Sequence, residues 1–203
     1  MAKRRGLFTK VMGMVSPAMP TAYDQAIQTS MAQERLYQHY HDGAGLYKVW
    51  GSPGSVLSAM LWGWERAAHP AQIHYAWDLK QAPSINEAIN NLVREGVKHL
   101  GVDELVSPRI FEPGCGIGGV SSLMAKEHPN YIIDGISLVT SQIAIARKRA
   151  NYLGLLNINY VVGNYLRVAV QDETYDAILA VETFCYIPAL EKSSLLAEMF
   201  RVL

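Results

Sequence analysis

The chain has 203 residues, of which 50% are hydrophobic and 18% are charged. This length fits about one ordinary domain with a small appendage, and the composition is that of a globular protein rather than a disordered one. Eighteen Lys and Arg residues balance 18 Asp and Glu residues, so the net charge gives no indication of a nucleic-acid-binding protein. No apolar run reaches the roughly 18 residues of a membrane span, so the sequence predicts no membrane-spanning helix.

The N-terminal part of the chain differs from the rest. In residues 1–21 four Lys and Arg residues precede the first acidic residue, Asp24, and we expect a basic, flexible tail. The alternative is an amphipathic helix that makes weak contact with a membrane surface. Residues 22–83 are helical in character and aromatic, and they hold all four tryptophans. Their composition predicts either a lid of short helices or an ordinary aromatic core.

The two cysteines, Cys115 and Cys185, lie far apart in the sequence, and the six histidines are scattered. Two cysteines do not form a disulfide framework, so we expect reduced thiols in a cytoplasmic protein. The histidine spacing fits no standard zinc site, and we expect no metal.

From residue 84 onward, predicted helices and strands alternate. Ser84 and Glu87 have the spacing of a capping box, which begins a helix that runs to about Leu100. Short apolar runs predict four strands, at residues 109–111, 131–136, 158–162 and 175–181. Helical periodicity predicts three further helices, at residues 121–126, 141–153 and 190–202. This alternation predicts an α/β domain with a doubly wound, Rossmann-like parallel sheet, preceded by an N-terminal helical lid.

The first predicted strand runs into a glycine-rich segment, Glu112-Pro113-Gly114-Cys115-Gly116-Ile117-Gly118-Gly119. Glycines let the backbone come close to a ligand, and ligands of parallel α/β sheets bind at the carboxyl ends of the strands, where this segment lies. The same glycines satisfy the Gly-x-Gly-x-x-Gly pattern of dinucleotide-binding proteins, so the glycines alone do not identify the ligand.

Two features favour a cationic ligand over NAD. Glu112 opens the turn, and its carboxylate would repel a pyrophosphate but suits a ligand with a free ammonium group. The end of the second predicted strand, where a dinucleotide-binding protein has a ribose-binding acid, holds Ser137, followed by Leu138 and then Gln142.

The segment from Glu112 to Gly119 resembles motif I of the class I S-adenosylmethionine-dependent methyltransferases, Asp/Glu-x-Gly-x-Gly-x-Gly. Three further segments resemble the branch of that family that includes the sterol, tocopherol and geranyl diphosphate C-methyltransferases. They are Gly135-Ile136-Ser137-Leu138-x-x-x-Gln142, Tyr175-Asp176-Ala177 with Glu182, and Glu198-x-x-Arg201-Val202-Leu203. The resemblance covers about residues 84–203 and implies a core domain that binds S-adenosylmethionine, the methyl donor.

The resemblance also implies a site for each matching residue. The methionine end of the donor would be lined by Glu112, Gly114, Cys115 and Gly116. The ribose or its neighbourhood would be met by Ser137, Leu138 and Gln142. Asn164 and Tyr165 stand where relatives have Asp-Ala, the segment beside the adenine.

The candidate catalytic residues are Glu182 and Tyr186. Glu182 stands where relatives keep an acid that faces the acceptor, and it is also a candidate donor contact. Tyr186 replaces the histidine of relatives, so the histidine that could act as a general base is missing there.

A carboxylate and aromatic side chains stabilise the cation that forms when an alkene is methylated, so we expect C-methylation of a small lipophilic acceptor, isoprenoid or sterol-like. The alternatives are O- or N-methylation of a small molecule, a nucleotide-dependent oxidoreductase, and a non-catalytic donor-binding fragment. Relatives continue beyond the position of Leu203 into a fifth strand and a hairpin, so we expect the C-terminal strands to be missing from this sequence. The fourth strand would then be an edge, covered by self-association in a homo-oligomer or by the N-terminal helices.

Overall fold

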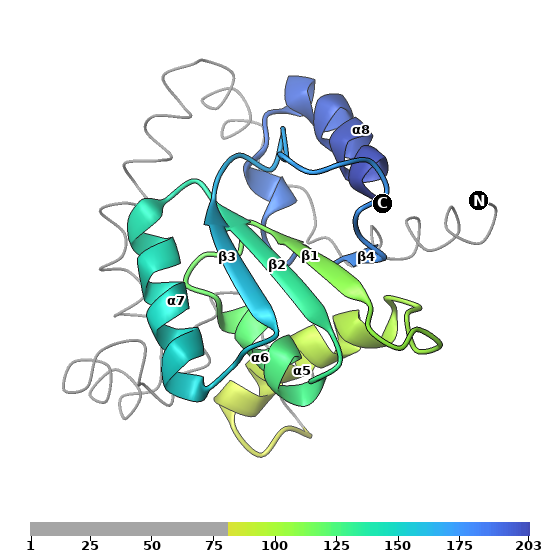
Figure 1. The fold of residues 1–203 in the computed structure, drawn as a ribbon. Helices are drawn as coiled ribbons and strands as arrows, with labels where there is room; N and C mark the ends of the chain where they lie inside the picture. Colours follow the sequence, from red (N-terminus) through yellow and green to blue (C-terminus); the bar gives the residue numbers. More distant parts are fainter. Residues whose placement is uncertain (1–80) are drawn as a thin grey trace.

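The structure is a computed structural model, and it describes residues 81–203. The predicted basic tail and nearly all of the predicted lid lie outside the described residues. The described part forms a four-stranded parallel sheet with helices packed against it (Figure 1). The parallel α/β architecture predicted from the sequence is therefore confirmed for this part of the chain.

The sheet consists of β1 (Arg109–Pro113), β2 (Ile132–Ser137), β3 (Ile158–Val162) and β4 (Ala177–Ile178). Its strand order is β3-β2-β1-β4. The chain thus starts in the interior of the sheet, moves outward to β3, and returns to place β4 on the other side of β1. The order reverses beside β1, and in open α/β sheets ligands bind where the strand order reverses.

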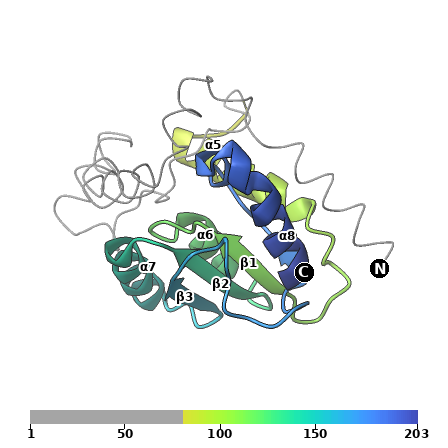
Figure 2. The same ribbon diagram turned by 90° about the horizontal axis from the view of Figure 1, so that it is seen from above.

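The helices are α5 (Ile85–Lys98), α6 (Gly119–Glu127), α7 (Thr140–Leu153) and α8 (Lys192–Val202). Neighbouring residues of β1 point to opposite faces of the sheet. Ile110 belongs to a buried cluster with side chains of α5 and α6, and Phe111 belongs to a separate buried cluster with side chains of α8. Helices therefore cover both faces, as in a doubly wound sheet. Figure 2 shows the same elements from above.

Helix α5 begins as the sequence predicts, because the Ser84 hydroxyl oxygen accepts a hydrogen bond from the Glu87 backbone N–H at 3.2 Å. The Glu87 carboxylate accepts from Arg94 at 2.7 Å, and the same guanidinium also binds Glu127 of α6 at 2.7 Å. Arg94 thus ties α5 to α6 in addition to their shared apolar core.

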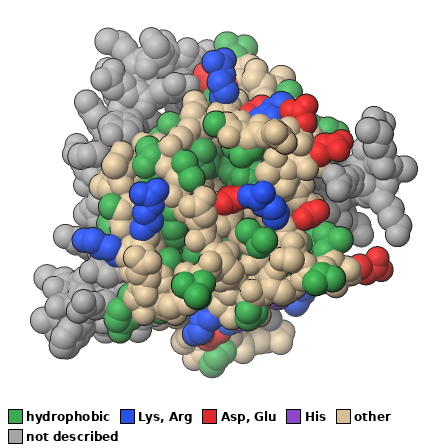
Figure 3. Space-filling model, viewed as in Figure 1, with side chains coloured by type: hydrophobic (Ala, Val, Ile, Leu, Met, Phe, Trp, Pro, Cys, Tyr) green, Lys and Arg blue, Asp and Glu red, His purple; other side chains and the backbone are tan. Residues whose placement is uncertain are grey.

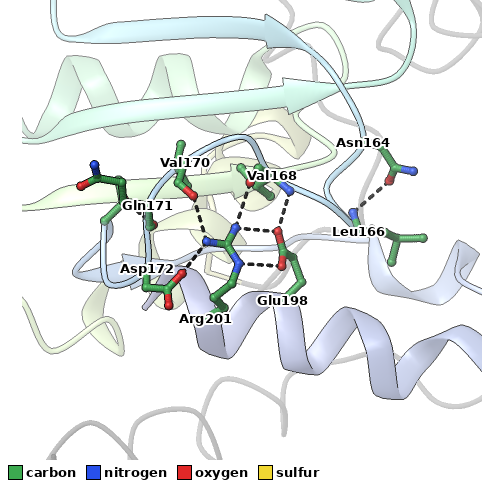
Figure 4. Close-up of polar contacts among 9 residues, drawn as sticks. Asn164, Leu166, Val168, Val170, Gln171, Asp172, Glu198 and Arg201 are labelled. Atoms are coloured by element: carbon green, nitrogen blue, oxygen red, sulfur yellow. Dashed lines mark hydrogen bonds and ion pairs between the residues drawn. The ribbon is translucent and has the colours of Figure 1, made fainter.

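Helix α8 is tied to the segment before β4 by Arg201 (Figure 4). The guanidinium donates to the carbonyl oxygens of Val168 and Val170, each at 2.8 Å, and to the Asp172 carboxylate at 2.9 Å. It also pairs with Glu198 one turn earlier on α8, at 2.8 Å. The planar fork of an arginine suits this set of acceptors.

The fourth strand is much shorter than the predicted 175–181. Ala177 and Ile178 are in register with β1, and two further backbone bonds flank them. The Asp176 N–H donates to the Arg109 carbonyl at 2.9 Å, and the Leu179 N–H donates to the Phe111 carbonyl at 3.0 Å. Before these residues, the Tyr175 N–H donates to the Val202 carbonyl of α8 at 2.9 Å. Periodicity located the strand but not its ends.

The surface of the described residues is mixed in character. Figure 3 shows hydrophobic side chains interspersed with both signs of charge on one face of the molecule. Within residues 81–203 no helix is long and apolar enough to cross a membrane. No group of three or more His, Cys, Asp or Glu side chains in that range could hold a metal ion.

Candidate functional site

The carboxyl ends of the strands are joined by backbone hydrogen bonds between the segments that follow them. The Cys115 N–H donates to the Ile136 carbonyl at 3.0 Å, and the Gly163 N–H donates to the Ser137 carbonyl at 3.0 Å. The predicted donor-site residues after β1, β2 and β3 therefore start from one edge of the sheet. Glu182 and Tyr186 follow β4, which pairs with β1.

The glycine-rich segment is a tight turn between β1 and α6. Gly114, Gly116 and Gly118 have φ angles of 72°, 54° and 79°, in the left-handed region that side chains disfavour. A β-carbon at Gly114 would collide with the Thr183 side chain, and one at Gly118 would collide with the Tyr160 ring. Gly114 and Gly118 are thus required both by backbone conformation and by close packing, and Gly116 by backbone conformation.

Glu112 lies beneath this turn and is 3% exposed. Ser121, at the start of α6, interacts with the Glu112 carboxyl group, but one carboxyl oxygen, Oε2, has no hydrogen-bond partner among the described residues. Burial raises the pKa of Glu112 to about 8, and Ser121 lowers it only in part. An unpaired buried carboxyl oxygen is costly unless a donor or a cation meets it, so this group fits the ammonium of a ligand such as the predicted methyl donor.

Ser137 and Gln142 bind each other. The Ser137 hydroxyl donates to the Gln142 side-chain oxygen at 2.9 Å and accepts from the Val139 N–H at 3.2 Å. Both side chains are buried, whereas Leu138 is 45% exposed. The pair therefore fastens β2 to the start of α7, and of the three predicted ribose-side residues only Leu138 presents its side chain to solvent.

The segment after β3 forms a turn closed by Asn164. Its side-chain oxygen accepts from the Leu166 N–H at 2.9 Å, so the oxygen that the sequence offers to an exocyclic amine is engaged within the turn. Tyr165 is 9% exposed, and its ring centroid lies 6.4 Å from that of Phe184. This ring contact brings the segments after β3 and β4 together.

Glu182 has a φ of 52°, which is unusual for a residue with a side chain. It is half-buried, and burial raises its pKa. The short 3-10 helix η2 (Phe184–Tyr186) follows, and the Tyr186 N–H donates to the Thr183 carbonyl at 3.2 Å. The Glu182 charge also helps burial to raise the pKa of the Cys185 thiol to about 11. Strained backbone of this kind is concentrated at functional sites.

Cys115 is 5% exposed, and burial together with the Glu112 charge holds its pKa well above the usual range. The protonated thiol is a small packing group in the cluster beneath α7. A nucleophilic role for this side chain would need a thiolate, which this environment disfavours.

Sequence reasoning missed two residues that shape the turn, Tyr160 and Thr183. Tyr160 pairs in register with Gly135 of the neighbouring strand, and the missing side chain of Gly135 leaves space for the tyrosine ring. A lone glycine in a predicted strand is the signal that could have indicated such a close contact. Nothing in the sequence pattern indicates that Thr183 packs against Gly114.

Comparison with known proteins agrees with this geometry. Residues 110–203 match the family model described as "Methyltransferase domain". The chain is 29% identical over 152 residues to 24-methylenesterol C-methyltransferase 3 of Arabidopsis thaliana, a match that covers 73% of this chain and 38% of that protein. The chain thus spans less than half of the length of this relative.

Two solved structures share the fold. Geranyl diphosphate C-methyltransferase from Streptomyces coelicolor A3(2) superposes with a TM-score of 0.63 at 17% identity, covering 93% of this chain and 64% of that one. The [4+2]-cyclase SpnF superposes with a TM-score of 0.64 at 23% identity, covering 84% of this chain and 56% of that one. The family match, the sterol methyltransferase relative and the common fold confirm the resemblance found in the glycine-rich segment. Residues 110–203 belong to the class I S-adenosylmethionine-dependent methyltransferase family.

Proposed function

We propose that this protein binds S-adenosylmethionine at the carboxyl edge of the sheet and methylates a carbon atom of a small lipophilic acceptor. The observation that carries the proposal is Glu112, a buried carboxyl group with one unpaired oxygen beneath a turn of three left-handed glycines. An ammonium group would pair with that oxygen, and the glycines leave no side chain between the backbone and the ligand.

The residues of this chain have two tasks in the proposed reaction. Glu112 and the glycine turn hold the methionine end of the donor, and Leu138, Asn164 and Tyr165 border its nucleoside end. When bound, the donor supplies an electrophilic methyl group on a sulfonium. The protein then has to exclude water and hold the acceptor carbon in line with that methyl group.

Glu182 is proposed to face the acceptor. Its backbone is held in a left-handed conformation and its side chain is half-buried after β4, on the same edge as the glycine turn. A carboxylate in a partly dry site stabilises a nearby developing cation more strongly than it would in water. Tyr186 contributes an aromatic side chain to the same segment and is a second candidate for this role.

A lipophilic acceptor is supported by the known relatives. Those that match this chain include a sterol C-methyltransferase and a squalene methyltransferase, and a geranyl diphosphate C-methyltransferase shares its fold. Carbon methylation of an isoprenoid or sterol-like molecule is therefore proposed ahead of O- or N-methylation.

The test begins with calorimetry of the wild-type protein with S-adenosylmethionine, S-adenosylhomocysteine and NAD. We expect the first two to bind and NAD not to bind. Labelled donor is then offered with isoprenoid diphosphates, sterols, squalene, phenols and amines. Transfer of the labelled methyl group to a carbon atom of an isoprenoid or sterol supports the proposal. Transfer to oxygen or nitrogen contradicts C-methylation, and tighter binding of NAD than of S-adenosylmethionine contradicts the donor assignment.

The alternative function is a reaction in which no methyl group is transferred, whether or not S-adenosylmethionine is bound. It is favoured by the structural similarity to the [4+2]-cyclase SpnF, since one fold supports unrelated reactions. A protein that binds S-adenosylmethionine tightly but consumes none with any acceptor of the panel would favour this reading.

A further inference from the structure

The hydroxyl group of Tyr160 stands at the centre of a buried polar cluster behind the glycine turn. Tyr160 is 2% exposed, and its hydroxyl donates to the Gly118 carbonyl at 3.2 Å. The same oxygen lies 3.0 Å from the Ser121 hydroxyl and 3.3 Å from the Ser122 hydroxyl, both on the first turn of α6. A tyrosine of β3 thus contacts both the turn and the helix that follows it.

This cluster continues to Glu112, because Ser121 also interacts with the Glu112 carboxyl group and lowers its pKa. The order of contacts is therefore Tyr160, Ser121 and Glu112. Hydroxyl groups in such a chain polarise one another, so each bond depends on the direction of the next.

Counting hydrogens shows how the two ends are linked. When Glu112 is ionised, the Ser121 hydrogen must point to the carboxylate, and only Tyr160 can then donate across the contact between Ser121 and Tyr160. When Glu112 is protonated, it can donate to Ser121, Ser121 can donate to Tyr160, and the Tyr160 hydrogen goes to the Gly118 carbonyl alone. The direction in which these hydroxyl groups donate therefore depends on whether the Glu112 carboxyl group is charged.

We propose that the Tyr160 hydroxyl is a positioning group of the donor site. It donates to the Gly118 carbonyl while Glu112 is protonated, and it donates to Ser121, and so supports the interaction of Ser121 with the carboxylate, when Glu112 is ionised. This inference rests on the proposed function, because Glu112 is the residue that meets the ammonium of the donor. A phenylalanine at this position would fill the same space against Gly135 and α7 but would leave Ser121 without its donor.

Other titratable groups do not take over this role. Among the described residues, the Cys115 thiol and the Tyr160 hydroxyl itself are the titratable groups on which the Glu112 charge acts, and burial raises the pKa of both. Both therefore stay protonated while Glu112 titrates near its pKa of about 8.

The test compares Tyr160→Phe with Tyr175→Phe. Tyr175 is also a buried tyrosine, and its hydroxyl bonds Asp134, away from the glycine turn. The dissociation constants of S-adenosylmethionine and S-adenosylhomocysteine are measured by calorimetry at pH values below and above 8. The ammonium of the free ligand loses its proton at the same pH in every experiment. The ratio of the variant's dissociation constant to that of the wild type therefore depends on pH only through groups of the protein.

For Tyr160→Phe we expect up to about tenfold weaker binding at neutral pH, the upper end of what one hydrogen bond between neutral groups contributes. The loss should shrink at alkaline pH, where Glu112 is ionised in both proteins. Tyr175→Phe should bind as the wild type does, even if its melting temperature falls. Equal affinity of Tyr160→Phe and wild type, or a loss that is the same at every pH, would overturn the proposal.

Two further measurements cover the remaining outcomes. Ser121→Ala removes the group through which Tyr160 would act on Glu112, so unchanged donor affinity in Ser121→Ala would overturn the proposal even if Tyr160→Phe does not fold. Amide hydrogen exchange needs no ligand: the Ser122 N–H, which donates to the Gly118 carbonyl at 3.0 Å, should exchange faster in Tyr160→Phe and not in Tyr175→Phe. If the wild type binds no donor, the proposed function fails, and unchanged exchange in Tyr160→Phe then refutes the positioning role separately.

Discussion

The side chain of Thr183 occupies the space that a β-carbon of Gly114 would need. Thr183 is 7% exposed and follows Glu182 directly, so the turn after β1 and the segment after β4 are packed against each other at the donor edge. The position of the proposed acceptor-facing carboxylate therefore depends on a glycine of motif I.

We expect Gly114→Ala to destabilise the protein by about 3 kcal/mol and to weaken donor binding strongly. About 1–2 kcal/mol comes from the left-handed backbone at φ 72°, and the rest comes from the collision with Thr183. Thermal or denaturant unfolding gives the first quantity and calorimetry with the donor gives the second.

Gly154→Ala is the matched control. Gly154 has a similar φ of 67° at the end of α7, but a β-carbon there would have no neighbour within 4 Å. It should lose only the backbone contribution of about 1–2 kcal/mol and keep its donor affinity. Equal destabilisation of the two variants would show that the contact with Thr183 is unimportant.

The backbone of Glu182 gives a second prediction. Replacement by glycine removes about 1–2 kcal/mol of left-handed strain and adds about 0.5–1 kcal/mol of unfolded-state entropy, so Glu182→Gly should be more stable by about 0.5–1 kcal/mol. The rate of turnover should nevertheless fall, because about 2–4 kcal/mol of transition-state stabilisation is lost, and donor affinity should change little. A gain in stability with a loss of turnover is typical of a residue kept for function.

Glu173 supplies the control, because it is exposed and has nearly the same φ, 53°. Glu173→Gly should gain similar stability and keep full turnover. Glu182→Gln keeps the strain and removes only the charge, so it should lose turnover without gaining stability. Normal turnover in Glu182→Gln would assign Glu182 to structure.

The sequence predicted the elements of this fold better than its contacts. The four strands and four α-helices of the described part were all expected, and β3 was predicted with its observed bounds, whereas the two short 3-10 helices were not expected. Such local patterns depend on neighbours in sequence. The contacts of Tyr160 with Gly118 and of Thr183 with Gly114 depend on strand order and register, which periodicity does not contain. The pairing of Ser137 with Gln142 was likewise hidden, because both side chains suit a ribose equally well.

The contacts of Arg201 lead to a third prediction. Its guanidinium binds two carbonyl groups and two carboxylates, and a lysine ammonium cannot reach this set with its single nitrogen. Arg201→Lys should lower the melting temperature and accelerate amide hydrogen exchange at Val168, whose N–H donates to Glu198. The exposed Arg167 lies on the same segment, and Arg167→Lys should change neither quantity. Unchanged exchange at Val168 in Arg201→Lys would mean that Glu198 holds the segment without Arg201.

The last prediction concerns pH and Glu112. The pKa of this group is raised from 4.5 to about 8 in the folded protein, so the folded state keeps a proton that the unfolded state has lost between these values. Unfolding then releases a proton, and the free energy of unfolding of the ligand-free protein should fall as the pH rises from about 4.5 to about 8. In Glu112→Gln that decline should disappear, whereas the exposed Glu104→Gln should retain it.

Donor binding should respond in the opposite direction, because the cation binds the ionised carboxylate. At neutral pH the donor must therefore displace the Glu112 proton, and calorimetry in buffers of different ionisation enthalpy should detect that proton release for the wild type. Glu112→Gln should release none and bind the donor more weakly. Equal proton release by wild type and Glu112→Gln would mean that Glu112 is already ionised in the free protein, and that its unpaired oxygen is not the group that receives the ammonium.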